Sequence, residues 1–177
     1  MIVTADDEIA QRARALRSQG EGERYRTDLL SGNYRMTELA AAIGLAQLPR
    51  LAGWNERRRA NAAWLSAHHN GVVTPVELPG AQHVFHQYTV RIPGRRRDAL
   101  CATLREQGIE SVVYYERCLH QQPLYQELGI GGLFPAAERA AQEVLSLPVH
   151  PGLSQDDLER IASAVNGALA GAEARRG

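Results

Sequence analysis

Apolar residues between residues 37 and 68 recur at helical spacing. Leu39, Ile43 and Ala46 fall on one stripe, and a polar, basic face lies opposite the stripe in the second half of this stretch. Pro49 interrupts the pattern. Proline removes one helical hydrogen bond and clashes with the preceding turn, at a cost of about 3 kcal/mol in a helix interior. The pattern therefore predicts a long helix with a kink or break at Pro49.

The residues before this helix are predicted to form a strand end, a shorter helix and a loop. The sequence "IVT" near the start has the character of a strand, and Thr4 or Asp6 can cap the helix that follows. Acidic residues come first in this helix, arginines come last, and Gly20 follows as a stop signal. Residues 20–36 are predicted to form a polar loop.

The character of the chain changes after residue 70, where short alternating stretches predict strands. Strands are expected at 72–78, 83–92 and 111–115, and helices at 95–109, 134–143 and 154–172, with a short strand after the second helix. This order indicates a small, mainly antiparallel sheet with helices packed on one face, an α+β arrangement within the α/β class. The expected domains are 1–36 and 37–170, followed by a frayed tail at 171–177.

Composition and charge narrow the possible functions. The 177 residues are 44% hydrophobic and 23% charged, with a formal net charge of zero and a pI near 7.0, which argues against binding nucleic acid or anionic membranes by bulk electrostatics. No apolar run approaches the roughly 20 residues needed to span a bilayer, and no leader-like segment is recognisable. Cys101 and Cys118 lack the spacing of metal sites or redox motifs. A cytoplasmic protein is therefore expected. All 20 basic Lys/Arg positions are arginine, so no side chain here can form a Schiff base.

Asn33 and Arg35 are candidate anion ligands just before the long helix. An amide NH₂ group and a planar guanidinium both bind oxygen anions, and a helix N-terminus adds backbone N–H groups and a positive dipole end. These features together suit a phosphate group. The alternative is that Asn33 only shapes a turn and Arg35 is solvated.

Histidine and tyrosine side chains form two further candidate groups. His83 and His86 lie three apart on the predicted strand, so they face opposite sides and cannot share one metal ion without a bulge. No metal site is expected. Tyr115 and His120 lie in "YYERCLHQQPLY" after the third predicted strand, where aromatic and imidazole groups suit a sugar or ring pocket. A loop of packed tyrosines and an ordinary sheet histidine remain the alternatives.

Several of these stretches occur together in an order typical of one family. "NYRMTELAAAIGLAQL" and "LSLPVHPG" are the most specific, and "HVFHQYTVRI" and "LHQQPLY" support them. The chain resembles the C-terminal part of the DegT/DnrJ/StrS-type sugar aminotransferases, over residues 2 to about 165. The resemblance implies the C-terminal portion of the fold-type-I fold of pyridoxal-phosphate enzymes, with residues 1–36 from the large domain and the rest from the small domain.

The resemblance also implies an activity, a cofactor and partners. Such enzymes transfer an amino group, usually from glutamate, to a nucleotide-linked keto sugar, and they act as homodimers with active sites at the subunit boundary. By resemblance, Asn33 and Arg35 reach the phosphate of pyridoxal 5'-phosphate in the neighbouring subunit. His86, Tyr115 and His120 lie near the nucleotide-sugar substrate.

The Schiff-base lysine of the family is expected to precede Met1, so the sequence is interpreted as an N-terminally truncated aminotransferase that is inactive alone. Its first strand and helix would then lack the sheet on which they pack, which predicts exposed apolar surface. The residues concerned are Ile2, Val3, Ile9 and Leu16. One alternative is a non-catalytic dimerisation module that joins a full-length relative as a heterodimer. Another is a branch of sugar dehydratases.

Overall fold

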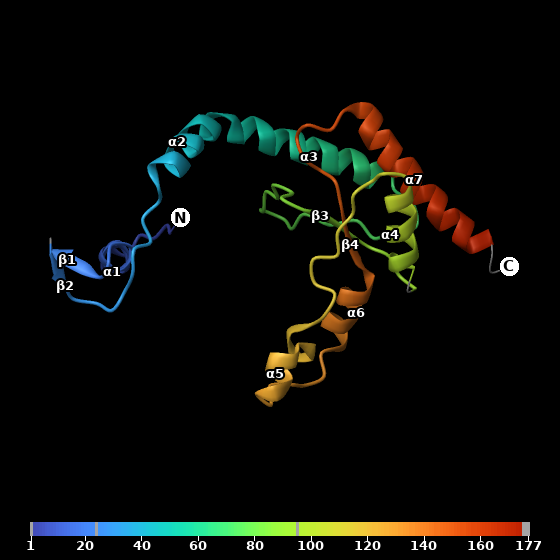
Figure 1. The fold of residues 1–177 in the computed structure, drawn as a ribbon. Helices are drawn as coiled ribbons and strands as arrows, with labels where there is room; N and C mark the ends of the chain where they lie inside the picture. Colours follow the sequence, from blue (N-terminus) through green and yellow to red (C-terminus); the bar gives the residue numbers. More distant parts are fainter. Residues whose placement is uncertain (1, 24, 95, 175–177) are drawn as a thin grey trace. The chain divides into compact units, whose positions relative to one another are not determined.

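The computed structural model describes residues 2–23, 25–94 and 96–174. The chain divides into two compact units, Met1–Arg50 and Leu51–Gly177, shown in one ribbon in Figure 1. The predicted boundary lay at 36–37. The structure instead groups the residues up to Arg50 together, so the division falls next to the predicted break at Pro49.

The first unit begins with helix α1 (Asp7–Arg17), which is held by local interactions. The Asp6 side chain accepts hydrogen bonds from the backbone N–H groups of Glu8 and Ile9, so Asp6 is the N-cap. The predicted strand before the helix is absent, since residues 2–4 have no strand pairing. The predicted exposure is confirmed: α1 buries no residue, and Ile2 and Val3 are largely exposed.

A small hairpin replaces part of the loop predicted at 20–36. Strands β1 (Glu21–Glu23) and β2 (Arg26–Thr27) pair antiparallel. Gly20 permits the chain reversal because its φ is +76° and a Cβ there would lie 1.8 Å from the Leu29 carbonyl oxygen. The polar sequence between Gly20 and Met36 concealed this pairing, because neither strand has an apolar face.

The break at Pro49 is confirmed. Helix α2 (Glu38–Gln47) starts at the N-cap Thr37 and ends before a single 3₁₀ turn, η1 (Leu48–Arg50), that contains the proline. Helix α3 (Leu51–His68) follows as the first element of the second unit. The missing N–H group of proline explains why the α-helical hydrogen-bond pattern stops here.

The second unit is built on an antiparallel sheet. Strand β3 (Tyr88–Arg91) pairs with β4 (Val144–Leu147), with Tyr88 opposite Leu147 and Val90 opposite Leu145. Single bridges at Val73 and Val112 extend the pairing on either side. The strands predicted at 72–78 and 111–115 are therefore reduced to one bridge each, and the one predicted at 83–92 is confined to residues 88–91.

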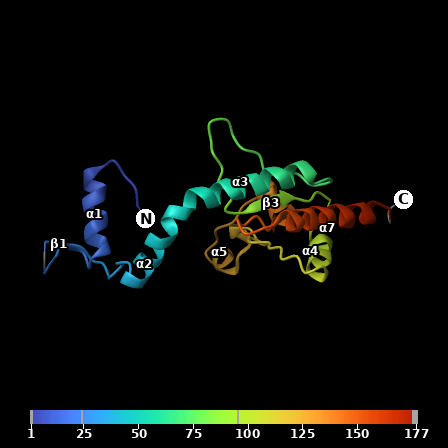
Figure 2. The same cartoon turned by 90° about the horizontal axis from the view of Figure 1, so that it is seen from above.

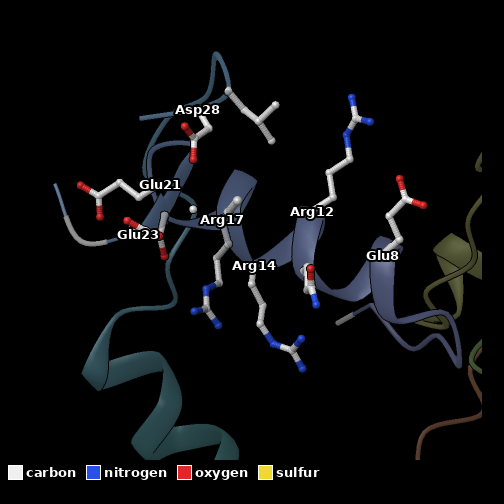
Figure 3. Close-up of a pocket in the computed structure, with 12 residues that line it drawn as sticks. Glu8, Arg12, Arg14, Arg17, Glu21, Glu23 and Asp28 are labelled. Carbon is white, nitrogen blue, oxygen red and sulfur yellow. The ribbon is translucent and has the colours of Figure 1, made fainter. Parts of the chain in front are cut away.

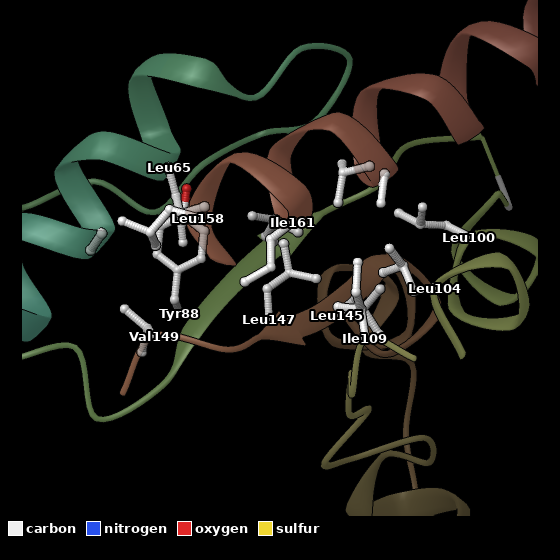
Figure 4. Packing of buried hydrophobic residues seen from close by; sticks show 14 of the residues in the cluster. Leu65, Tyr88, Leu100, Leu104, Ile109, Leu145, Leu147, Val149, Leu158 and Ile161 are labelled. Atoms are coloured by element: carbon white, nitrogen blue, oxygen red, sulfur yellow. The ribbon is translucent and has the colours of Figure 1, made fainter. Parts of the chain in front are cut away.

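Helices cover the side of this sheet that carries Tyr88 and Val90. Helix α7 (Gln155–Ala174) contacts both α3 and α4 (Arg97–Glu106), and α4 also contacts β4 (Figure 1, Figure 2). Figure 4 shows the core where side chains from these elements meet, among them Leu65, Leu104 and Ile161. The expected α+β arrangement is confirmed, because the apolar positions of both strands face the helices.

The remaining elements are short and lie between α4 and β4. They are the 3₁₀ turn η2 (Leu119–Gln121), α5 (Pro123–Glu127) and α6 (Pro135–Glu143). Ser154 caps the last helix, α7, because the Asp157 N–H donates to Ser154 Oγ over 3.2 Å and the Asp157 carboxylate accepts from the Ser154 N–H. The tail predicted at 171–177 differs in part: residues 171–174 are helical, and residues 175–177 lie outside the described residues.

No helix in the part of the chain that the structure describes is long and apolar enough to cross a membrane.

Candidate functional site

The loop that carries Asn33 and Arg35 is fixed to the end of α1. Asn33 forms an isolated antiparallel bridge with Ser18, and the Tyr34 N–H donates to the Arg17 carbonyl over 2.9 Å. On the other strand of this contact, the Gln19 N–H donates to the Gly32 carbonyl, also over 2.9 Å. The backbone around Asn33 is therefore held in place although its side chain is exposed.

Asn33 and Arg35 are in direct contact. The Asn33 Oδ1 atom accepts two hydrogen bonds from Arg35, one from the backbone N–H and one from Nε, each 3.1 Å long. Because both partners are donors, the amide has to present its oxygen to Arg35, which turns its NH₂ group away. In the described chain no hydrogen bond engages that NH₂ group or the terminal nitrogens of Arg35. Two sets of donors are thus free for an oxygen anion.

Helix α2 begins three residues after Arg35. Thr37 caps the helix by accepting from the Ala40 N–H over 3.2 Å, so this end is ordered without a ligand. The dipole of this helix adds a partial positive charge near the loop. The negative charge of the exposed Glu38 in the first turn partly offsets it. The local charge balance of the loop therefore depends mainly on Arg35.

His86 lies in an irregular segment and not on the predicted strand. Phe85 beside it has a φ of +46°, an uncommon value for a residue with a side chain, and its N–H donates to His83 Nδ1 over 2.8 Å. The argument that His83 and His86 face opposite sides of a strand is therefore wrong. Arg58 of α3 donates to the carbonyl groups of Phe85 and His86 and holds this segment, and the imidazole of His86 is exposed.

A second arginine of α3 anchors the same segment. Arg59 Nη1 lies 2.9 Å from both the Glu77 carboxylate and the His83 carbonyl. The His83 N–H also donates to Glu77, and this hydrogen bond, followed by that from Arg59, lowers the pKa of Glu77. The pattern "NERRRANAAW" indicated only a solvated basic face, so these anchoring roles of Arg58 and Arg59 were missed.

Tyr115 and His120 differ in their surroundings. Tyr115 is 79% exposed, whereas the His120 side chain is 13% exposed and its Nε2 atom lies 3.0 Å from the Glu138 carboxylate. His120 and Glu138 line an open cavity of about 490 Å³ together with glutamines and the glycine-rich segment 129–132. Among the described residues, no hydrogen bond or ring contact joins His86, Tyr115 and His120 to one another.

A larger open cavity of about 700 Å³ lies beside α1 and the β1–β2 hairpin in the first unit. Figure 3 shows that Arg12 and Arg14 point to different sides of the helix and do not converge on one point. The carboxylates of Glu21, Glu23 and Asp28 also line this cavity. This cavity is a poor binding site, because charges of both signs line it and its arginine side chains do not point to one place. None of the predicted ligand residues lines it.

The profile described as "DegT/DnrJ/EryC1/StrS aminotransferase family" matches residues 1–166. The chain belongs to this family.

Relatives of known name match almost all of the chain but only part of their own length. A "pleiotropic regulatory protein" of Geobacillus stearothermophilus is 43% identical, over 93% of this chain and 45% of its own. The UDP-N-acetyl-3-dehydro-α-D-glucosamine 3-aminotransferase of Acidithiobacillus ferrooxidans is 38% identical, over 97% and 46%. The chain spans about half the length of the curated relatives it matches.

Solved structures also match nearly the whole of this chain and less than half of their own length. The crystal structure of Streptomyces venezuelae DesV in complex with a ketimine intermediate superposes with a TM-score of 0.84 at 34% identity, over 93% of this chain and 45% of that one. The aminotransferase TlmJ from Streptoalloteichus hindustanus also has a TM-score of 0.84, at 33% identity, over 96% and 47%. The expected fold is therefore confirmed.

Proposed function

We propose that this chain forms part of a pyridoxal-phosphate-dependent aminotransferase that acts on a nucleotide-linked keto sugar and takes its amino group from a glutamate-type donor. The observation that carries this proposal is the family match over residues 1–166, together with relatives named as aminotransferases of UDP- and dTDP-linked sugars. The product would be an amino sugar for polysaccharide or antibiotic biosynthesis. The cytoplasm, where nucleotide sugars are made, is the proposed location.

Asn33 and Arg35 are the proposed ligands of the cofactor phosphate. The donor chemistry fits, because an amide NH₂ group and the terminal guanidinium nitrogens are free in the described chain, and all of them donate to oxygen anions. The Arg35 side chain is held through Nε, so less side-chain entropy is lost when phosphate binds. These two residues are exposed, which suits a phosphate held in a neighbouring subunit.

The amine for the Schiff base has to come from residues outside the printed sequence, because that sequence contains no lysine. When bound, pyridoxal phosphate supplies the electron sink that transamination needs. The proposed role of this chain is to bind the phosphate through Asn33 and Arg35 and thereby to orient the cofactor. His86, Tyr115 and His120 are proposed to contact the nucleotide sugar.

The apolar surface of α2 favours a second role, association with a full-length relative as a heterodimer. This helix buries no residue, and several of its large side chains are mostly exposed. They are Leu39, Ile43 and Leu45. In this arrangement the chain would lend Asn33 and Arg35 to the cofactor site of its partner without catalysing a reaction itself.

The test isolates the assembly that contains this chain, through a tag added after Gly177, and measures bound pyridoxal phosphate and amino transfer to UDP- and dTDP-keto sugars. Arg35→Ala and Asn33→Ala are expected to weaken cofactor binding by about 10- to 100-fold, because each removes hydrogen bonds to a charged phosphate. Arg50→Ala, at an exposed arginine of the same unit, is the matched control.

Two results would contradict the proposal. An assembly that neither contains pyridoxal phosphate nor transfers an amino group would remove the proposed activity. Equal cofactor affinity in Arg35→Ala, Asn33→Ala, Arg50→Ala and the unaltered protein would remove Asn33 and Arg35 as phosphate ligands. Cofactor binding only in the presence of a second, lysine-containing chain would favour the heterodimer over an aminotransferase of one chain type.

A further inference from the structure

His120 and Glu138 are brought together only by the fold. His120 belongs to η2 and Glu138 to the first turn of α6, and the two are 18 residues apart in the sequence. Their side chains are 13% and 34% exposed, and the imidazole Nε2 atom lies 3.0 Å from a carboxylate oxygen. The Phe134 ring packs against the imidazole with the ring centroids 4.9 Å apart. The imidazole is therefore held by a carboxylate and by a ring.

The chemistry of the pair determines where the proton of a neutral imidazole lies. An ionised carboxylate can only accept hydrogen bonds, so Nε2 has to carry the hydrogen in this contact. Nδ1 then keeps its lone pair and is the one acceptor atom of the neutral ring. The imidazole is mostly withheld from water, whereas the carboxylate is about one-third exposed, so the contact is partly shielded relative to a pair on the open surface. Glu138 thus selects one tautomer as well as one ring orientation.

We propose that Glu138 is a positioning residue for His120, which holds the Nε2–H tautomer so that Nδ1 is left to accept a hydrogen bond from the substrate. This inference rests on the proposed function, in which His120 contacts the nucleotide sugar. The sugar is the part of such a substrate that carries hydroxyl donors. The amide side chains of Gln121 and Gln126 line the same cavity and are suited to the same kind of polar ligand.

The primary test reads the tautomer directly, without cofactor or activity. The full chain is labelled with ¹⁵N and studied by two-bond ¹H–¹⁵N correlation spectra of His120 in alkaline buffer, where imidazoles are neutral. The unaltered protein is expected to show Nε2–H. Glu138→Ala should give a mixture of tautomers, and Glu138→Gln should restore Nε2–H because its amide oxygen can still accept. Glu127→Ala, at an exposed glutamate of α5, should change nothing.

Core methyl resonances of Leu104 and Leu145 show in the same samples whether each variant is folded, so a variant that fails to fold is replaced in the comparison by Glu138→Gln. An Nδ1–H tautomer in the unaltered protein overturns the proposal. The same Nε2–H population in folded Glu138→Ala as in Glu127→Ala also overturns it.

The second test is kinetic and uses the assembly described above. Glu138→Ala and His120→Ala are each expected to raise KM for the nucleotide sugar about tenfold, the effect of one hydrogen bond, with kcat little changed. The double variant should be no worse than His120→Ala, since Glu138 acts through His120. Additive effects overturn the positioning role. An assembly without aminotransferase activity removes the proposed function instead and leaves the tautomer result intact.

Discussion

The two units of the chain hold their secondary structure by different means. The second unit buries side chains of β3, β4 and three helices in a common core. In the first unit, Gly20 is the one buried residue among those described, and α1 and α2 bury none. Its helices are defined by the caps Asp6 and Thr37. Isolated helices shorter than about 12–15 residues are marginal in water, so local signals can place a helix but do not stabilise it.

The largest difference between the units is expected for truncation of a leucine. Leu65→Ala in α3 removes a fully buried side chain and should lower the free energy of unfolding by about 2–5 kcal/mol. Leu39→Ala in α2 removes a side chain that is 73% exposed and should change it by less than about 0.5 kcal/mol. Urea unfolding followed by circular dichroism measures both. Equal effects would show that the first unit has a core of its own in solution.

The pH dependence of stability should also belong to the second unit. Both ring nitrogens of His69 are buried and have no hydrogen-bond partner among the described residues, and burial, followed by the nearby His68, lowers the pKa of His69 from 6.5 to about 4. The unfolded chain therefore binds a proton at higher pH than the folded chain does. Stability is complete above pH 6.5 and falls as the pH drops to about 4, by on the order of 3 kcal/mol.

His69→Leu tests this assignment, because it removes the titrating group and keeps an apolar side chain in the site. The stability difference between the unaltered protein and this variant should change with pH only between about 4 and 6.5. His86→Leu, at an exposed histidine, is the control and should leave the pH profile unaltered. A difference between the unaltered protein and His69→Leu that does not vary with pH would contradict the assignment.

A smaller, local effect is expected in the first unit at Gly20. Ala at this position would have a positive φ and a Cβ 1.8 Å from the Leu29 carbonyl oxygen, so the hydrogen bonds from the Asp28 and Leu29 N–H groups to the Gly20 carbonyl should be lost. Gly44→Ala is the matched control: its Cβ meets nothing within 4 Å, and it should favour α2 by up to about 1 kcal/mol. Backbone chemical shifts of the two variants measure both effects. An unchanged hairpin in Gly20→Ala would show that this turn is looser than described.

The smallest effects concern the helix caps. Ser154→Ala removes the side-chain acceptor for the Asp157 N–H and the hydroxyl donor to the Asp157 carboxylate. The Ser154 backbone N–H, which this variant keeps, is the main cause of the lowered pKa of Asp157, and the hydroxyl is the second. It should cost about 1 kcal/mol of global stability, because α7 belongs to the core. Asp6→Ala should fray α1 and leave the urea midpoint unchanged. A common shift of the midpoint in both variants would mean that the two units unfold together.

Local signals in the sequence predicted most of the helices and their ends. Asp6, Pro49 and Ser154 act through their own backbone or side-chain chemistry, so each role is recognisable without knowledge of the fold. The extent of the strands was less predictable. The alternation at 83–87 suggested a strand, but the positive φ of Phe85 and the arginines of α3 hold these residues in an irregular segment.

The candidate site was predictable to a smaller extent. Asn33 and Arg35 are close in sequence and directly precede a helix, so their side-chain chemistry alone suggested an anion site as one of two alternatives. The partner of His120 could not be found this way, because Glu138 lies in another element, 18 residues further along the chain. Contacts between residues distant in sequence depend on how the backbone packs, and no local pattern encodes them.

The second unit has a core of its own. We propose that the first unit, by contrast, needs a partner to become stable and to present Asn33 and Arg35. Hydrogen exchange of the backbone amides, measured for the chain alone and for its assembly, tests this claim most directly. In the chain alone, amides of α1 and α2 should exchange rapidly and those of β3 and β4 slowly, and the assembly should protect α1 and α2. Protection of α1 and α2 equal to that of β3 in the chain alone would contradict it.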